Sequence, residues 1–223
     1  MARLFDKIEG HGSAKLRAAI LTILTMAKIR TLKPNVTRDE AVRHFTEGAW
    51  SRGVSLIRGP VRSLAELYIP YRLFQVSIFS GGREERQLVA LDAVRGVLDL
   101  YQFSSPAGDA DLLTLETRNA LPSGLDTGVA EKRLIEKVRR IIFTRGFFRV
   151  RDLKIEATAL SGEICVPYWV AFRGADDRVR LAVLDAVRRK PEGAKVRRLI
   201  EEWLRSDRET PFASQAPESK VLS

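Results

Sequence analysis

Apolar residues follow two different spacings along this chain. Leu134, Val138 and Ile141 recur every three or four residues, which places them on one face of a helix. Over residues 153–159, apolar and polar residues alternate one by one, which is the pattern of a strand with one buried face. The two spacings occur in separate segments and indicate a protein of the α+β class.

Helices are predicted in four places. The first covers residues 14–32 and ends before a proline, because the residue that precedes a proline avoids the helical conformation. The second begins at a capping box formed by Thr37 and Glu40 and extends to about residue 52. A third ends near Gly146, and a fourth buries an apolar stripe close to the C-terminus. That stripe consists of Val196, Leu199, Ile200, Trp203 and Leu204.

Two groups of three strands are expected between these helices, because apolar, β-branched and aromatic runs there are bounded by turn residues. The first group covers residues 64–79, 87–95 and 97–103. The second covers residues 153–159, 164–172 and 179–183, with a turn predicted at Ser161-Gly162. Each group suits a small antiparallel sheet with one helix packed against it.

Two stretches of the sequence repeat each other. Pro70-Tyr71 is followed by Leu-Asp-Ala-Val-Arg at residues 91–95, and Pro167-Tyr168 is followed by the identical pentapeptide at residues 184–188. The same motifs in the same order predict a duplicated unit. The expected fold is therefore α+β with two related units, each a helix packed on an antiparallel sheet of about three strands, plus an N-terminal and a C-terminal helix. The two sheets either stand apart or join edge to edge.

This repeat sets the predicted organisation of the chain. A linker is expected between the two repeats, where the residues are polar and interrupted by prolines and glycines. A disordered tail is expected at the C-terminus, which is polar and contains proline. The parts are an N-terminal helix (residues 1–34), a first repeat (35–104), a linker (105–128), a second repeat with the C-terminal helix (129–206) and a disordered tail (207–223).

The first unit has a recognisable order of motifs. Residues 36–42 contain a threonine, two acids and an alanine, and residues 89–96 end a strand with an aspartate and a glycine turn. This order resembles PepSY-like and cystatin-like domains, over residues 35–103 and more loosely over residues 128–190. In the second unit Arg189 stands where the first has the turn glycine. The resemblance implies a small binding or inhibitory module without chemistry of its own.

Side chains suited to catalysis are few. The chain has two histidines, His11 and His44, and one cysteine, Cys165, and none has metal-ligand spacing. No nucleophile motif or phosphate-binding loop occurs. We therefore predict no catalytic residue, no metal, no cofactor and no enzymatic activity. Because a lone cysteine leaves no internal disulfide, we expect a reducing compartment, the cytoplasm.

The repeated aspartates, Asp92 and Asp185, have two interpretations. They are either a pair of acid or cation-binding groups, or strand-end residues that accept amide hydrogen bonds in the following turn. We favour the second interpretation.

The aromatic residues beside the repeated prolines are the candidates for ligand binding. Tyr168 and Trp169 are adjacent in a strand, so they point to opposite faces and one is expected to lie off the main core. The predicted ligand-binding residues are Tyr71, Tyr168, Trp169, Arg95 and Arg188.

Positive charge is concentrated in the second unit. The net charge is +10, and residues 129–208 hold 20 lysines and arginines against 12 acids. Such a face binds phosphates, or it is a solvated surface with interspersed acids. The candidate anion-binding residues are Lys132, Arg133, Lys137, Arg140, Arg189, Lys190, Arg197 and Arg198. We expect a non-enzymatic binding or scaffolding protein for an unknown protein or small-molecule ligand, with nucleic-acid or anionic-partner binding as the alternative.

The apolar run at residues 18–27 is the remaining ambiguity. It is either the core of an export signal or part of a packed amphipathic helix, and we favour the helix because Asp6 and Glu9 precede it and no cleavage motif follows. No run approaches the roughly 18–20 apolar residues that span a bilayer.

Overall fold

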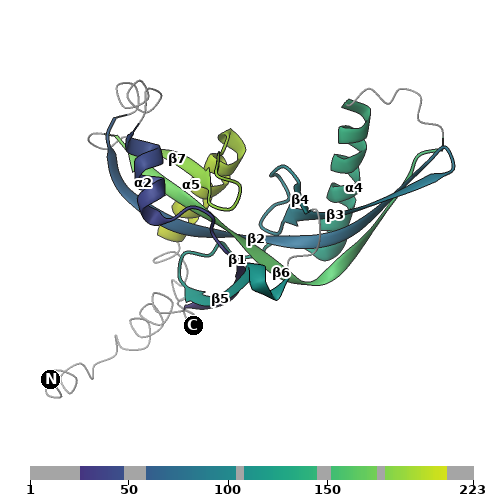
Figure 1. The fold of residues 1–223 in the computed structure, drawn as a ribbon, viewed down its shortest axis with the longest axis horizontal. Helices are drawn as coiled ribbons and strands as arrows, with labels where there is room; N and C mark the ends of the chain where they lie inside the picture. Colours follow the sequence, from purple (N-terminus) through teal and green to yellow (C-terminus); the bar gives the residue numbers. More distant parts are fainter. Residues whose placement is uncertain (1–25, 48–58, 104–107, 145–151, 175–178, 210–223) are drawn as a thin grey trace, which may run out of the picture.

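The computed structural model describes residues 26–47, 59–103, 108–144, 152–174 and 179–209 (Figure 1). In chain order these residues form β1 (Ala27–Leu32), α2 (Arg38–Thr46), β2 (Val61–Ser80), β3 (Arg83–Asp92), β4 (Tyr101–Phe103), the 3-10 helix η1 (Asp109–Asp111), β5 (Leu112–Thr117), α4 (Thr127–Thr144), β6 (Lys154–Arg173), β7 (Arg180–Asp185), β8 (Lys190–Pro191) and α5 (Ala194–Glu209).

The eight strands of the described residues belong to one curled mixed sheet. Its main path runs β4-β3-β2-β6-β1-β5, while β7 pairs with β6 and β8 with β7. β1 and β6 meet in parallel at one residue pair, and the other neighbouring strands are antiparallel. Figure 1 shows β2 and β6, each 20 residues long, running through the whole molecule. The α+β class is confirmed, and the two predicted groups of strands meet in one sheet through β2 and β6.

The middle of β6 differs from the sequence-based prediction. A turn was expected at Ser161-Gly162, but β6 continues through these residues. Arg72 lies opposite Glu163 and Phe74 lies opposite Ala159, so three residues of β6 lie opposite one residue of β2. Gly162 has a φ of 82°, which glycine adopts without a steric penalty. The glycine therefore makes a bulge that bends the strand rather than a turn that ends it.

Helices cover both faces of this sheet. α4 buries Ala130, Leu134 and Val138 against residues of β2 and β3. α2 buries Ala41 and Phe45 against residues of β6 and β7. Both helices therefore contact strands of the two predicted units, α4 through β2, β3 and β6 and α2 through β2, β6 and β7, and Figure 1 shows α2 beside β7 and α4 beside β3.

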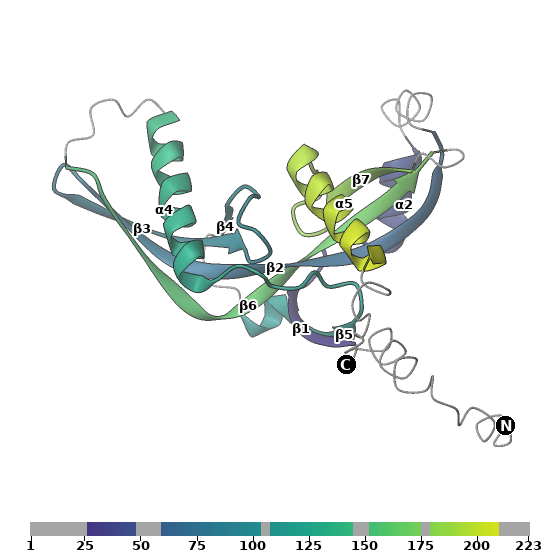
Figure 2. The same cartoon turned by 180° about the vertical axis from the view of Figure 1, so that it is seen from behind.

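α5 covers the opposite face of the sheet. Its residues Val196, Leu199 and Ile200 belong to the largest core cluster, together with Tyr71 and Tyr168. Figure 2 shows α5 and α4 rising from different halves of the long strands. The predicted C-terminal helix is therefore present, and its apolar stripe closes the core as expected.

The N-terminal part departs from the prediction at one end. Residues 27–32, predicted as helix, form β1, which pairs with β5 from Ala27 opposite Thr117 to Leu32 opposite Leu112. β5 itself lies inside the segment predicted as a linker. The hydrogen bonds that make residues 27–32 a strand come from β5, about 85 residues further along the chain. The residues next to β1 in sequence therefore do not indicate that it is a strand. Residues 207–209, predicted as part of the disordered tail, belong to α5 instead. Residues 14–25 of the predicted helix and residues 210–223 of the predicted tail lie outside the described residues.

Candidate functional site

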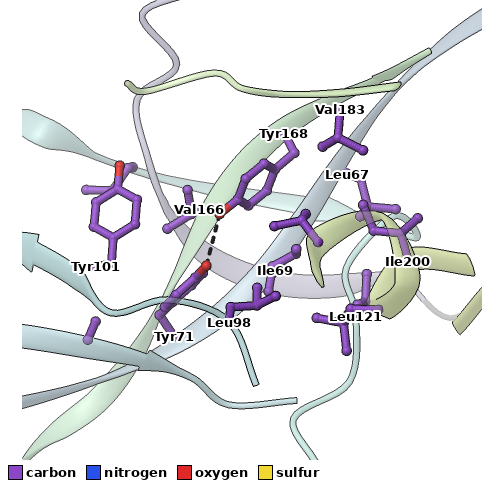
Figure 3. Packing of buried hydrophobic residues seen from close by; sticks show 14 of the residues in the cluster. Leu67, Ile69, Tyr71, Leu98, Tyr101, Leu121, Val166, Tyr168, Val183 and Ile200 are labelled. Atoms are coloured by element: carbon purple, nitrogen blue, oxygen red, sulfur yellow. Dashed lines mark hydrogen bonds between the residues drawn. The ribbon is translucent and has the colours of Figure 1, made fainter. Parts of the chain in front are cut away.

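The two Pro-Tyr motifs meet at the centre of the sheet. Ile69 and Val166 lie opposite each other in β2 and β6, and neither side chain is exposed. On either side of this pair, Tyr71 and Tyr168 point to the same face. Their hydroxyl oxygens are 2.9 Å apart and share a hydrogen bond in the buried core (Figure 3). Burial raises the pKa of both phenols well above its usual value, so both remain neutral.

Asp92 organises the turn after β3. Its Oδ1 accepts hydrogen bonds from the backbone N–H groups of Arg95 at 2.9 Å and Gly96 at 2.8 Å. Its Oδ2 accepts a third from the N–H of Leu98 at 2.8 Å. A completely buried carboxylate is tolerated where several amide donors satisfy it.

Asp185 organises the turn after β7 in a similar but incomplete way. Its Oδ1 accepts hydrogen bonds from the N–H groups of Val187 and Arg188, both at 2.8 Å. Its Oδ2 is buried and has no hydrogen-bond partner among the described residues. Both repeated aspartates thus accept turn amides, which is the interpretation that the sequence favoured.

The predicted ligand-binding aromatic residues are not on the surface. Tyr71 is 3% exposed, Tyr168 1% and Trp169 8%. Tyr168 and Trp169 do point to opposite faces, since they belong to different core clusters. As expected, one of them lies off the main core: Trp169 belongs to the smaller cluster under α2. It is nevertheless buried there, so it is not available to a ligand on the surface. The indole N–H of Trp169 even donates a hydrogen bond to the carbonyl oxygen of Val36, at 2.9 Å.

The two predicted ligand-binding arginines lie at the turns and contact other parts of the chain. The guanidinium of Arg188 stacks over the ring of Tyr101, 3.3 Å from its centroid. Arg95 forms an ion pair with Glu202 of α5. Both arginines therefore hold the turns to β4 and α5, and no common ligand-binding surface joins them to the three buried rings.

Half of the predicted anion-binding residues bond to backbone carbonyl oxygens. Arg133 donates to Arg95, and Lys137 donates to Leu98 at 2.7 Å. Burial, followed by the nearby Lys195, lowers the pKa of Lys137. Two further residues, Arg189 and Arg197, donate to the carbonyl oxygens of Asn35 and Glu192. The other four residues, Lys132, Arg140, Lys190 and Arg198, are exposed, and so are Arg133 and Arg189.

The histidine and cysteine side chains have packing roles. His44 makes an edge-on contact with the ring of Phe45, with ring centroids 5.3 Å apart. Cys165 is buried, and burial raises the pKa of its thiol to about 12. A thiol with such a pKa is a poor nucleophile at neutral pH. His11 lies outside the described residues.

An apolar groove lies between α4 and the outer end of the β2–β3 hairpin. Its volume is about 190 Å³. Val138, Ile141 and Ile142 of α4 form one wall, and Glu85 and Gln102 open to solvent at the rim. The other lining residues are Ile78, Ser80, Gln87, Val89, Leu100 and Leu153.

Sequence reasoning did not identify this groove. The available signal was the apolar stripe of α4, whose last residues Ile141 and Ile142 are only half-buried. The stripe indicated which face of the helix packs, but not that the hairpin would leave Ile141 and Ile142 only partly covered.

Within the described residues, no three or more His, Cys, Asp or Glu side chains gather where they could bind a metal ion. No helix in this part of the chain combines the length and the apolar character that crossing a membrane requires. In comparisons with known proteins, no family model, curated protein or solved structure matches the chain.

Proposed function

We propose that this chain is a non-enzymatic binding protein, and that the apolar groove beside α4 receives one apolar side chain of a partner protein. The single observation behind the proposal is the groove itself. Three aliphatic residues of α4 face the hairpin there, and Ile141 and Ile142 are left partly exposed. Exposed apolar surface rimmed by polar groups is typical of partner-binding sites.

The size of the groove favours a side chain over a small-molecule ligand. Pockets for drug-sized ligands have volumes of about 300–1,000 Å³ and enclose most of the ligand. A cavity of about 150 Å³ accommodates a molecule the size of benzene. The groove, at about 190 Å³, therefore matches one aromatic or branched aliphatic side chain. Protein interfaces commonly depend on a few such anchor residues in fitted pockets.

The roles of the repeated residues support the non-enzymatic part of the proposal. Asp92 and Asp185 hold turns through backbone amides, and the Cys165 thiol is buried with a raised pKa. These side chains are bound within the fold and do not line the groove. The cytoplasmic location expected from the single cysteine stays a prediction.

We also propose that the chain arose by duplication of a strand-and-turn unit that contains the Pro-Tyr and Leu-Asp-Ala-Val-Arg motifs. Three correspondences support the duplication. Tyr71 lies opposite Asp92 as Tyr168 lies opposite Asp185. The N–H of Ala93 donates to Pro70 as that of Ala186 donates to Pro167. The third correspondence is in the turns. Gly96 and Arg189 each follow the aspartate by four positions and both have a positive φ, of 66° and 57°.

A peptide-display selection tests the groove. From a random library, we expect the intact protein to select peptides with a shared aromatic or aliphatic anchor. Ile141→Arg, which places a charge in the groove, should abolish their binding. Phe143→Arg is the matched control, because Phe143 lies on the same helix, is 47% exposed and does not line the groove. Selected peptides that bind Ile141→Arg as well as wild type, or a selection without any binding peptide, would refute the proposal.

A further inference from the structure

The two aspartate turns differ in one hydrogen-bond donor. In each turn a residue with positive φ, Gly96 or Arg189, follows the aspartate by four positions. Two residues later the first turn has Leu98, whose N–H donates to Oδ2 of Asp92. The second turn has Pro191 at that place, and proline has no N–H to donate. This substitution explains why Oδ2 of Asp185 is without a partner among the described residues.

On the side of the core, few groups near Asp185 could stabilise its ionised carboxylate. The residue is 0% exposed, and the hydroxyl groups of Tyr71 and Tyr168 bond to each other. Tyr101 also has a buried hydroxyl group without a hydrogen-bond partner among the described residues. Glu192, from the segment before α5, adds a second negative charge nearby. An ionised Asp185 therefore has one oxygen with neither solvent nor a donor.

Positively charged groups around the turn offset only part of the cost of ionising the buried Asp185. Arg188 and Lys190 both favour the ionised carboxylate, but burial is the larger effect and raises the pKa of Asp185. The pKa of Glu192 is raised as well, first by burial and then by Asp185.

The turn is directly connected to α5. The N–H of Glu192 donates to the carbonyl oxygen of Val183 at 2.8 Å, which fixes the segment before the helix to β7. Arg197, in the first turn of α5, donates to the carbonyl oxygen of Glu192 at 3.2 Å. Any loosening of the turn therefore acts on the attachment of α5 to the core.

We propose that the Asp185 turn is a proton-sensitive latch that holds α5 on the sheet. With Asp185 protonated, the turn is neutral and α5 packs tightly. Ionisation leaves an unpaired charge in the core, which is relieved when the turn and α5 move away. Because the folded-state pKa is raised above the ordinary 3.8, this stabilisation is complete below that value and is lost as the pH rises through the folded-state pKa. The latch lies on the sheet face opposite the groove and does not depend on the proposed function.

Trp203 of α5, which packs partly buried against the core, provides the measurement. The full chain labelled with 5-fluorotryptophan has three tryptophans, and Trp203→Phe identifies the ¹⁹F signal of interest. We expect that signal to change in one step as the pH is raised from about 4 to about 8, and Asp185→Asn to remove the step. Pro191→Ala restores an N–H and should move the step to lower pH by roughly one to two units, the effect of one charged hydrogen bond.

Glu192→Gln separates the two acids. If Asp185 is the titrating group, this variant keeps the step and lowers its midpoint, because a neighbouring negative charge is removed. The proposal is overturned if wild type shows no step, if the step survives in Asp185→Asn, or if it disappears in Glu192→Gln. An unchanged midpoint in Pro191→Ala, whose exposed proline can be replaced without altering the core, would also overturn it.

Discussion

Removal of one hydroxyl from the Tyr71–Tyr168 pair should destabilise the protein more than removal of both hydroxyls. The two oxygens are 2.9 Å apart, and the residues are 3% and 1% exposed, so water cannot replace a lost partner. Tyr71→Phe or Tyr168→Phe leaves the other hydroxyl buried and unsatisfied, at a cost of about 1–3 kcal/mol. In the double variant no polar group is stranded, and the loss is about 1 kcal/mol, the net value of one hydrogen bond.

Urea denaturation of the four proteins, followed by circular dichroism, completes a double-mutant cycle. We expect the double variant to lose less than half of the sum of the two single losses. Tyr101→Phe is the matched control. Its buried hydroxyl has no hydrogen-bond partner among the described residues, so its removal should leave the free energy of unfolding unchanged or raise it. Additive losses in the cycle would show that the two hydroxyls do not depend on each other and would refute the reasoning.

Two further predictions concern the turns and the basic surface. Gly96→Ala should lower the free energy of unfolding by about 1–2 kcal/mol, because φ is 66° and the new Cβ would lie 3.0 Å from Leu125 Cδ2; wild-type stability in urea would contradict this. The alternative function predicts that duplex DNA binds through exposed residues such as Arg140 and Arg198, with an affinity that falls steeply as salt is added and that weakens in Arg140→Glu. Absence of binding at low salt would remove that alternative.

The helices with strong local signals were predicted well. Thr37 and Glu40 form the expected capping box, with the Glu40 N–H donating to Thr37 and the Glu40 carboxylate accepting from the Thr37 N–H. The stripe through Leu134 and Val138 packs as α4. Both signals involve residues three or four positions apart, so the sequence itself contains the interacting partners.

The candidate site was predicted poorly, and the reason lies in burial. Tyr71, Tyr168 and Trp169 were candidates because Tyr168 and Trp169, adjacent in a strand, point to opposite faces, which suggested that one aromatic side chain lies off the main core. In the structure both faces are covered, by helices whose place on the sheet no local pattern specifies. The groove was missed for the same reason, since it forms where the last turns of α4 lie beside the outer end of the β2–β3 hairpin.

The sequence by itself determined the caps, the helix stripes, the strand runs and the repeated Leu-Asp-Ala-Val-Arg turns, because these depend on contacts within a few residues. Only the tertiary structure decided that β2 and β6 join in one sheet, that α2 and α4 pack on hairpins distant in sequence, and that Asp185 lacks the donor that Asp92 has. These outcomes depend on long-range pairing, in which a strand or helix takes its partners from the whole chain rather than from its neighbours.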